Sequence, residues 1–377
     1  MENDTSAKKL NLKIFHTESH RSWGGQEIRV LSECIWMKRQ GHHPLLIAPE
    51  KSQIYSRAKS VDLNVVPMSF TILTAMSDYV KLRRLIKKNR PDVINTHGNM
   101  DAKIGLTAAF GMKVPCIIRS RHHSHPVSPK WHNKLMYRHM SHYIFTGAQC
   151  VSDQISRELT VDPSRIIMSP SGINPPAQMP DNNAVQGVQT ELKLGRTARF
   201  IGSVAMLRDW KGHRFILEAF SRISDQFPFH HLVIVGDGDE MKLLKRQRED
   251  LGLSNRIHFT GFRDNPWPYY RAFDVKILAS TKNELMSQVI PQAMYAGCPV
   301  IGTRVGGIPD VIEDGTNGLL IEPESASALA RAITRTLSEP EGVRFRAERA
   351  FELASQQFTI DAMGKKIMKL YDRSLSC

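Results

Sequence analysis

The chain has 377 residues, about twice the length of a typical domain, so we expect two domains with separate hydrophobic cores. Its 41% hydrophobic and 23% charged residues are typical of a globular protein, and no window reaches the roughly 18 apolar residues of a membrane span. The net charge of +14 lies mostly in residues 1–180, with 25 Lys and Arg against 13 Asp and Glu, which predicts attraction to an anionic surface.

The N-terminal residues Met1 to Lys9 are polar, and the first apolar run, Leu10–Phe15, is too short for a secretory signal. We therefore expect a cytoplasmic protein. Five scattered cysteines without a CxxC pair predict neither a zinc site nor a disulfide framework. The sequence has no zinc-finger spacing and no RNA-binding signature, so we expect no nucleic-acid partner.

Short apolar runs alternate with longer helical patterns, which predicts repeated βα units, parallel sheets and an α/β fold class. A helix over Gln26–Gln40 ends at Gly41, and Val80–Lys88 is a basic amphipathic helix. We interpret the latter as a crossover helix, with a membrane-surface helix as the alternative. The strands predicted in the first half are Leu10–Phe15, Leu45–Ala48, Val93–Asn95, Cys116–Arg119, Tyr143–Thr146 and Arg165–Met168.

The pattern stops at Asn174–Thr190, which is rich in proline and polar residues, so we place a linker there. The expected organisation is an N-terminal domain of residues 1–175, a linker of 176–197, a C-terminal domain of 198–356 and a final helix within 357–377. The strands predicted in the second domain are Ala198–Val204, His231–Val235, Ile257–Thr260, Val275–Leu278, Pro299–Gly302 and Gly318–Ile321.

Three turns between a strand and a helix are suited to an anion, because free backbone N–H groups and the positive end of the helix dipole meet there. The first is Gly24-Gly25, where a tight loop is the alternative interpretation. The second contains Arg208 and Lys211, two cations beside a helix start. The third is Ser280–Pro291, where Pro291 predicts that a helix starts near Ser287 or Gln288.

The segment from Glu284 to Ile308 resembles the nucleotide-sugar motif of glycosyltransferase family 4, which comprises retaining enzymes of the GT-B fold. The resemblance extends over most of the chain and implies two Rossmann-like domains, a cleft between them and a last helix that returns to the N-terminal domain. Further segments that carry it are Gly24-Gly25, Asp92–His97, Ser171–Asn174, Lys211-Gly212, Val235–Gly238 and Pro309–Leu320.

The resemblance also implies roles for individual residues. Glu284 would contact the donor sugar, Lys211 the diphosphate, and His97 would line the sugar site. Met206 stands where the family has an arginine, so we expect Arg208 to compensate. The full set of donor-binding candidates is Gly24, Gly25, Gly236, Met286, Ser287, Gln288 and Gln292, in which Gln292 replaces a ribose-binding Glu and Met286-Ser287 replace Phe-Gly.

A basic loop after the strand Cys116–Arg119 contains Arg119, Arg121 and His122, which are acceptor-binding candidates or else parts of a solvated loop. The Asp237-Gly238-Asp239 triplet superficially matches a metal-binding DxD motif, but its Val-Gly-Asp-Gly context resembles the end of a strand in the GT-B fold. We therefore expect no metal and no cofactor.

These observations predict a retaining glycosyltransferase that moves a sugar from a nucleotide-sugar donor, such as a UDP-sugar, to an envelope glycan or lipid-linked acceptor of the lipopolysaccharide, O-antigen or capsule type. The basic N-terminal domain predicts peripheral contact with an anionic membrane. Two alternatives remain, a UDP-sugar 2-epimerase of the same fold and a non-enzymatic protein that binds anionic surfaces.

Overall fold

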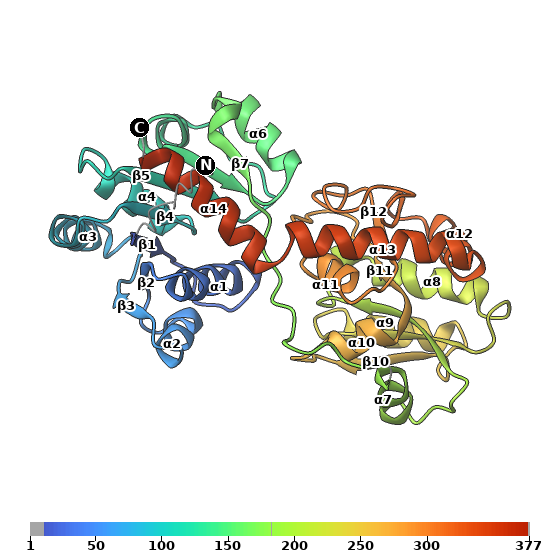
Figure 1. Cartoon of the computed structure of the whole chain (residues 1–377). Helices are drawn as coiled ribbons and strands as arrows, with labels where there is room; N and C mark the ends of the chain where they lie inside the picture. Colours follow the sequence, from blue (N-terminus) through green and yellow to red (C-terminus); the bar gives the residue numbers. More distant parts are fainter. Residues whose placement is uncertain (1–10, 182, 376–377) are drawn as a thin grey trace, which may run out of the picture. The chain divides into compact units, whose positions relative to one another are not determined.

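The computed structural model describes residues 11–181 and 183–375. The chain forms two compact units, an N-terminal unit of Met1–Ser171 with Ile360–Cys377 and a C-terminal unit of Gly172–Thr359. Each unit is built on one parallel β-sheet that is flanked by helices (Figure 1). The predicted α/β class with two Rossmann-like domains is confirmed.

The sheet of the N-terminal unit has the strand order β3-β2-β1-β4-β5-β6-β7. Strands β4 and β5 are buried throughout, because a parallel sheet is covered on both faces; each begins with apolar residues and ends with buried polar ones. The strands are β1 (Lys13–Thr17), β2 (His43–Ala48), β3 (Asn64–Pro67), β4 (Val93–Thr96), β5 (Cys116–Arg121), β6 (Tyr143–Thr146) and β7 (Ile166–Met168).

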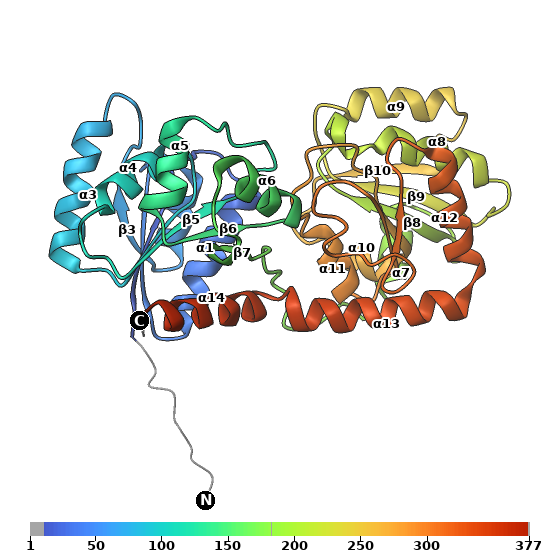
Figure 2. The ribbon, with the colours of Figure 1, turned by 90° about the horizontal axis from the view of Figure 1, so that it is seen from above.

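Helices cover this sheet on both faces (Figure 2). They are α1 (Gly25–Arg39), α2 (Gln53–Ser60), α3 (Ala75–Asn89), α4 (Met100–Ala109), α5 (Trp131–Leu135), the π-helical turn η1 (Met136–Met140), α6 (Gln149–Leu159), the 3-10 turn η2 (Pro163–Arg165) and α14 (Ile360–Leu375).

The last helix, α14, belongs to the N-terminal unit, as predicted. Its residues Met363, Ile367 and Leu370 are buried in one cluster with Trp36 of α1, and Ile360 is partly buried against the same cluster. Their spacing places them on one face of the helix. Gly364 lies so close to Trp36 that a Cβ atom there would approach the indole ring to 2.4 Å.

The sheet of the C-terminal unit has the order β10-β9-β8-β11-β12-β13. Its strands are β8 (Arg199–Val204), β9 (His230–Val235), β10 (Ile257–Gly261), β11 (Phe273–Leu278), β12 (Val300–Thr303) and β13 (Leu319–Ile321). Its helices are α7 (Ala184–Glu191), the 3-10 turn η3 (Asp209–Lys211), α8 (His213–Ile223), α9 (Met241–Asp250), α10 (Trp267–Ala272), α11 (Val289–Tyr295), α12 (Ala326–Ser338) and α13 (Pro340–Gln357).

Two elements differ from the sequence analysis. The segment 176–197, expected to be a linker, contains α7, which packs on α10 and buries Val188 in the core of the C-terminal unit. The nearby prolines hide this short helix, although Ala184 and Val188 are spaced one helical turn apart. The edge strand β3 is not predicted, because it is only partly buried and holds just two apolar residues, Val65 and Val66.

Candidate active site

In both sheets the strand order reverses beside the first strand, next to β1 and β4 in the N-terminal unit and next to β8 and β11 in the C-terminal unit. Ligands of open parallel sheets bind at the carboxyl ends of the strands at such switch points. The candidate residues of the sequence analysis follow these strand ends. His97 follows β4, Lys211 follows β8 and Glu284 follows β11.

The C-terminal unit brings Lys211 and Glu284 together. Lys211 Nζ lies 2.7 Å from Glu284 Oε2, and the Ser280 hydroxyl donates to the same oxygen at 2.6 Å. The two side chains are only 14% and 8% exposed. A charge-assisted pair in such a site is strongly held. A cation and a hydrogen-bond acceptor are therefore fixed side by side at the end of the sheet.

Two close backbone approaches fix the loops that carry this pair. Gly212 has a φ of +67°, and a Cβ atom on it would lie 1.9 Å from the carbonyl oxygen of Ala279. On the other side of the pair, Gly306 has a φ of +56°, and a Cβ atom on it would lie 1.7 Å from the carbonyl oxygen of Glu284. Both positions need glycine, because a side chain has neither the space nor the preferred backbone conformation.

Two further titratable side chains are buried near the pair, and the sequence analysis did not identify them. Lys276 of β11 is fully buried, and its ammonium has no hydrogen-bond partner among the described residues. Burial and the nearby charge of Lys211 lower the pKa of Lys276 to about 7. His213, at the start of α8, is also buried with both ring nitrogens unpartnered, and burial together with Lys211 and Lys276 lowers its pKa to about 3.

Arg208 takes a different partner from the one expected. Its guanidinium pairs with the Asp239 carboxylate, and its side chain is 36% exposed. Met206, which stands in the position of the family's arginine, is 58% exposed and carries no charge. In the structure Lys211 therefore forms an ion pair with Glu284, whereas Arg208 forms an ion pair with Asp239. A role for Arg208 in binding diphosphate remains a prediction.

The predicted helix start near Ser287 or Gln288 agrees with α11, for which Gln288 is the N-cap. The Gln288 side-chain amide donates to the carbonyl oxygen of Gly172 at 3.0 Å. The side-chain oxygen of Gln292 accepts from the Tyr270 hydroxyl at 3.0 Å. Both amides thus have protein partners in this structure, and Met286 is 9% exposed.

Gly236, another donor-binding candidate, lies where two loops cross. Its φ is +143°, and a Cβ atom would lie 1.9 Å from the carbonyl oxygen of Ala205. Its N–H donates to the carbonyl oxygen of Gly261 at 2.9 Å. The glycine is thus required by the close approach of the backbone, whatever else it contacts.

In the N-terminal unit His97 is the middle ring of a three-histidine chain. His97 Nε2 lies 3.0 Å from His16 Nδ1, and His97 Nδ1 lies 2.9 Å from His122 Nε2. The rings are stacked. Burial and the neighbouring His122, His16 and Arg29 hold the pKa of His97 well below its usual range, so the ring is neutral at pH 7.

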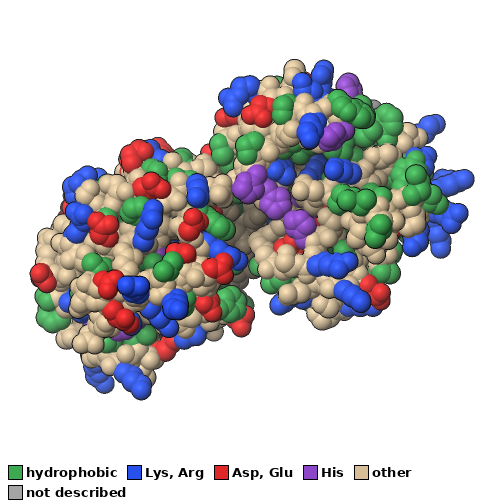
Figure 3. All heavy atoms as spheres, turned by 180° about the vertical axis from the view of Figure 1, so that it is seen from behind, with side chains coloured by type: hydrophobic (Ala, Val, Ile, Leu, Met, Phe, Trp, Pro, Cys, Tyr) green, Lys and Arg blue, Asp and Glu red, His purple; other side chains and the backbone are tan. Residues whose placement is uncertain are grey.

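The contacts with His16 and His122 limit what else His97 can contact. Its ring is fully buried and both nitrogens are engaged, whereas His122 is partly exposed. A neutral imidazole has one donor and one acceptor, so the tautomers of the three rings are coupled. Of the three histidines, His122 is the one that a ligand could contact. Figure 3 shows other histidine side chains on the surface of the N-terminal unit, where the fully buried His16 and His97 are not visible.

The Gly24-Gly25 turn is less open to an anion than the sequence indicated. Glu27, in the first turn of α1, has Oε2 only 3.4 Å from where a Gly24 Cβ atom would lie. Burial opposes its ionised form, but the hydrogen bond with His20 and the backbone of Glu27 and Gly24 hold its pKa below the usual value. The Glu27 carboxylate therefore lies beside this turn, and a phosphate contact at Gly24 and Gly25 remains a prediction.

Beside that turn, Glu18, His20 and Glu27 are the one group of described residues whose ligand atoms all lie within 4.8 Å of one another, as a metal site would require. Their atoms already have partners. His20 Nδ1 lies 3.2 Å from Glu27 Oε1, and Gln26 donates to Glu18 at 2.6 Å. Burial and the Asp101 charge raise the pKa of Glu18 to about 7, which weakens it as an ionic ligand. Metal independence remains a prediction.

Arg119 and Arg121, the acceptor candidates, extend from the end of β5 and are only 4% and 7% exposed. Both line a cavity of about 300 Å³ within the N-terminal unit, together with residues of α4 and α5. The structure thus places these two arginines in a pocket rather than in a solvated loop.

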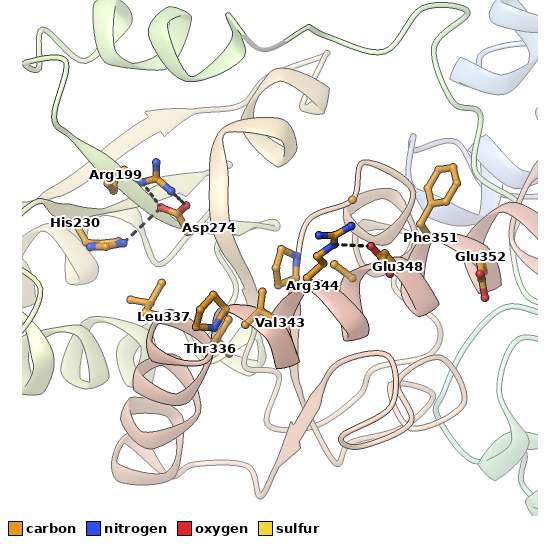
Figure 4. Close-up of a pocket in the computed structure, with 14 residues that line it drawn as sticks. Arg199, His230, Asp274, Thr336, Leu337, Val343, Arg344, Glu348, Phe351 and Glu352 are labelled. Carbon is orange, nitrogen blue, oxygen red and sulfur yellow. Dashed lines mark hydrogen bonds and ion pairs between the residues drawn. The ribbon is translucent and has the colours of Figure 1, made fainter.

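A larger cavity, of about 880 Å³, lies in the C-terminal unit beside the starts of β8, β9 and β11 (Figure 4). Arg199 and His230 both point to Asp274 on one side of it, and α13 supplies the other side (Figure 4). Because it adjoins the amino ends of the strands, it is at the opposite edge of the sheet from Lys211 and Glu284, and we do not assign the reaction to it.

None of the helices within the described ranges combines the length and the apolar character that crossing a bilayer requires.

Similarity to known proteins is found for both halves of the chain. Residues 23–176 match the family profile described as Glycosyltransferase Family 4, and residues 196–339 match that of Glycosyl transferases group 1. The lipopolysaccharide core biosynthesis glycosyltransferase LpsE of Rhizobium meliloti is 32% identical over 48% of this chain and 52% of its own length. The chain thus matches about half the length of this curated relative.

A second relative is matched over more of its length. The UDP-Gal:alpha-D-GlcNAc-diphosphoundecaprenol alpha-1,3-galactosyltransferase of Escherichia coli is 27% identical over 72% of this chain and 73% of its own. Among solved structures, Anabaena HepE in complex with UDP has a TM-score of 0.84 at 19% identity, with 97% of this chain and all of HepE covered. A glycosyltransferase from Rickettsia africae has a TM-score of 0.85 at 20% identity, with 97% and 99% covered.

The two structural likenesses show a shared fold, and the two family profiles match in the same order along the chain as its two units. With the Glu284 motif at the switch point of the second sheet, these matches establish that the chain belongs to glycosyltransferase family 4, with the GT-B fold.

Proposed function

We propose that this chain is a retaining glycosyltransferase that moves a sugar from a UDP-sugar to an envelope glycan or a lipid-linked acceptor. The observation that carries the proposal is the Lys211–Glu284 pair at the carboxyl ends of β8 and β11. It offers a cation for a diphosphate and a carboxylate for sugar hydroxyls in one place. The named relatives are transferases, so a 2-epimerase is not favoured.

In the reaction, the bond between the anomeric carbon and the diphosphate oxygen breaks, and a bond to the acceptor oxygen forms on the same face. The departing diphosphate takes the proton of the acceptor hydroxyl. Negative charge builds on the diphosphate as it leaves, and Lys211 is placed to stabilise it. The Glu284 carboxylate is already engaged by Lys211 and by the Ser280 hydroxyl, so we favour direct front-face attack by the acceptor.

Donor binding is the first test of this function. The wild-type chain and Lys211→Ala are heated with UDP-, GDP- and ADP-sugars, because a bound ligand raises the Tm in proportion to the logarithm of its concentration over its Kd. We expect a UDP-sugar to raise the Tm of the wild type and to do so less in the variant. A wild-type Tm that no nucleotide sugar raises would contradict the proposed function.

Acceptor dependence separates a transferase from an epimerase. A transferase should consume a UDP-sugar quickly only when a lipid-linked acceptor is supplied. Conversion of the UDP-sugar to its C2 epimer without acceptor would instead assign the chain to the alternative.

We propose further that the N-terminal unit docks on the inner face of the membrane through α3 and the loop before it. Ile72, Leu73 and Met76 are 83%, 97% and 75% exposed. On the same helix Lys81 and Arg84 are exposed, as are Lys87 and Lys88. Exposed apolar groups beside a row of cations are typical of a surface that inserts shallowly between anionic lipids. Such docking fits a lipid-linked acceptor and a cytoplasmic location.

A further inference from the structure

The cavity at the end of β5 is lined by five basic side chains and no acidic one. They are Lys103, Arg119, Arg121, Lys130 and His132. We propose that this cavity binds a phosphate or diphosphate group carried by the acceptor. The proposal rests on the transferase function above, and it assigns to the acceptor an anionic group that the sugar-transfer step itself does not require.

The two arginines at its base have no counter-ion. No carboxylate in residues 11–181 or 183–375 lies within ion-pair distance of Arg119 or Arg121. Arg121 Nη2 donates to the carbonyl oxygen of His125 at 2.7 Å, but its buried Nε–H has no acceptor. Arg119 Nη1 donates to the carbonyl oxygens of Thr96 and Ser120, at 3.2 and 2.9 Å.

Two buried, adjacent and unpaired guanidinium groups are costly, and burial and the Arg119 charge lower the pKa of Arg121. The acidic residue nearest to this cavity along α4, Asp101, cannot relieve the cost. Its oxygens accept from the hydroxyls of Thr17 and Ser19, at 2.8 Å each, and from the backbone N–H of His97 at 3.0 Å. An anion in the cavity would supply the missing charge.

The volume and the position of the cavity agree with a phosphate on a lipid. About 300 Å³ holds a diphosphate, and planar guanidinium groups are the side chains best suited to its oxygens. Lys130 and His132 at its lining flank Trp131, which is 76% exposed. The turn η1 that continues α5 packs on α4, which packs on α3, so the cavity and the proposed membrane surface belong to contiguous elements.

The test uses the full-length protein saturated with UDP, so that the donor site is filled. Calorimetric titration with inorganic pyrophosphate and with farnesyl diphosphate is carried out on the wild type, Arg121→Gln, the rim variant Lys103→Met/Lys130→Met and the control Arg157→Gln. Arg157 is exposed on α6 of the same unit and does not line the cavity. The rim variant replaces two surface cations and should not disturb folding.

We expect Arg121→Gln to raise the Kd of pyrophosphate on the order of tenfold or more, because charge-assisted hydrogen bonds are lost. The rim variant should raise it less and reduce its dependence on salt. UDP should bind all four proteins alike, which keeps this result separate from a failure of the donor site. Tighter binding of farnesyl diphosphate than of pyrophosphate assigns the phosphate to a lipid, and equal binding assigns it to a soluble source.

The proposal is overturned if Arg121→Gln and the rim variant bind pyrophosphate as the control Arg157→Gln does. It is equally overturned if the UDP-saturated wild type binds neither phosphate compound.

Discussion

Lys211 Nζ and Glu284 Oε2 lie 2.7 Å apart. The cation that we propose to stabilise the leaving diphosphate is therefore ion-paired with a carboxylate of the same site in this structure. If Lys211 stabilises the departing diphosphate more than it stabilises the bound donor, its removal should lower kcat more than it raises KM. We expect Lys211→Ala to lower kcat by about 10²–10³-fold, the usual cost of one preorganised stabiliser.

Arg208→Ala is the companion variant, because Arg208 is paired with Asp239 instead. A loss of kcat comparable with that of Lys211→Ala would show that Arg208 leaves Asp239 to bind the diphosphate. A change within a few-fold would show a surface ion pair.

Near-normal kcat in Lys211→Ala, with the fold intact by circular dichroism, would remove Lys211 from the proposed mechanism.

Transfer should proceed without a divalent cation. The Asp237–Asp239 triplet has Asp239 engaged by Arg208, and the atoms of Glu18, His20 and Glu27 already have protein partners. We therefore expect the initial rate to be unchanged after dialysis against EDTA. Loss of activity in EDTA that manganese restores would contradict this prediction and would make Glu18, His20 and Glu27 the first residues to substitute.

Membrane docking should have an electrostatic and an apolar part. Binding of the wild type to vesicles with anionic lipid should fall steeply with salt, since each Lys or Arg near the surface contributes about 1 kcal/mol that screening weakens. Ile72→Asp/Leu73→Asp should bind weakly even at low salt, because these two exposed side chains would no longer insert. Co-sedimentation measures both.

The matched control for docking is Phe229→Asp, an exposed apolar residue of the C-terminal unit that is 60% exposed. It should bind vesicles as the wild type does. Equal binding of the wild type to neutral vesicles at high salt would exclude the electrostatic part of the account.

The elements that the sequence predicted best are the fully buried ones. A strand such as β11 is buried at five of its six positions, and its apolar residues Val275, Ile277 and Leu278 stand out from the chain. The half-exposed edge strand β3 and the short helix α7 lack such a signal and are found only in the structure. The local sequence pattern reflects how deeply an element is buried. An element that packs against only one neighbour is less buried, so its pattern is weak.

The candidate site divides in a similar way. The Lys211–Glu284 pair follows from a motif that spans two strand ends, and the structure brings its two residues together. Nothing in the sequence distinguishes Lys276 or His16 from surface residues, because their burial depends on which strands lie beside them. The carboxylate of Glu27 at the glycine turn is hidden for the same reason, since its direction depends on the fold.

Lys276 should make the stability of the protein depend on pH in the alkaline range. Its pKa is about 7 in the folded chain against 10.5 as the ordinary value, so between these limits the unfolded chain binds a proton that the folded chain does not. The free energy of unfolding should therefore rise as the pH rises from 7 to about 10, and the stability that the neutral amine allows is lost as the pH falls through 7.

Lys276→Met should remove this dependence, because the side chain keeps its length and loses its charge. We expect the variant to be more stable than the wild type at pH 7, because it has no ammonium that must lose its proton on folding, and the difference to shrink as the pH rises towards 10. Urea unfolding at pH 7, 8.5 and 10 measures the difference. The control is Lys245→Met, on an exposed position of α9, which should follow the wild type at every pH. Parallel curves for Lys276→Met and the wild type would mean that the Lys276 ammonium keeps its charge in the folded chain, and would direct attention to Glu284 as the partner it reaches.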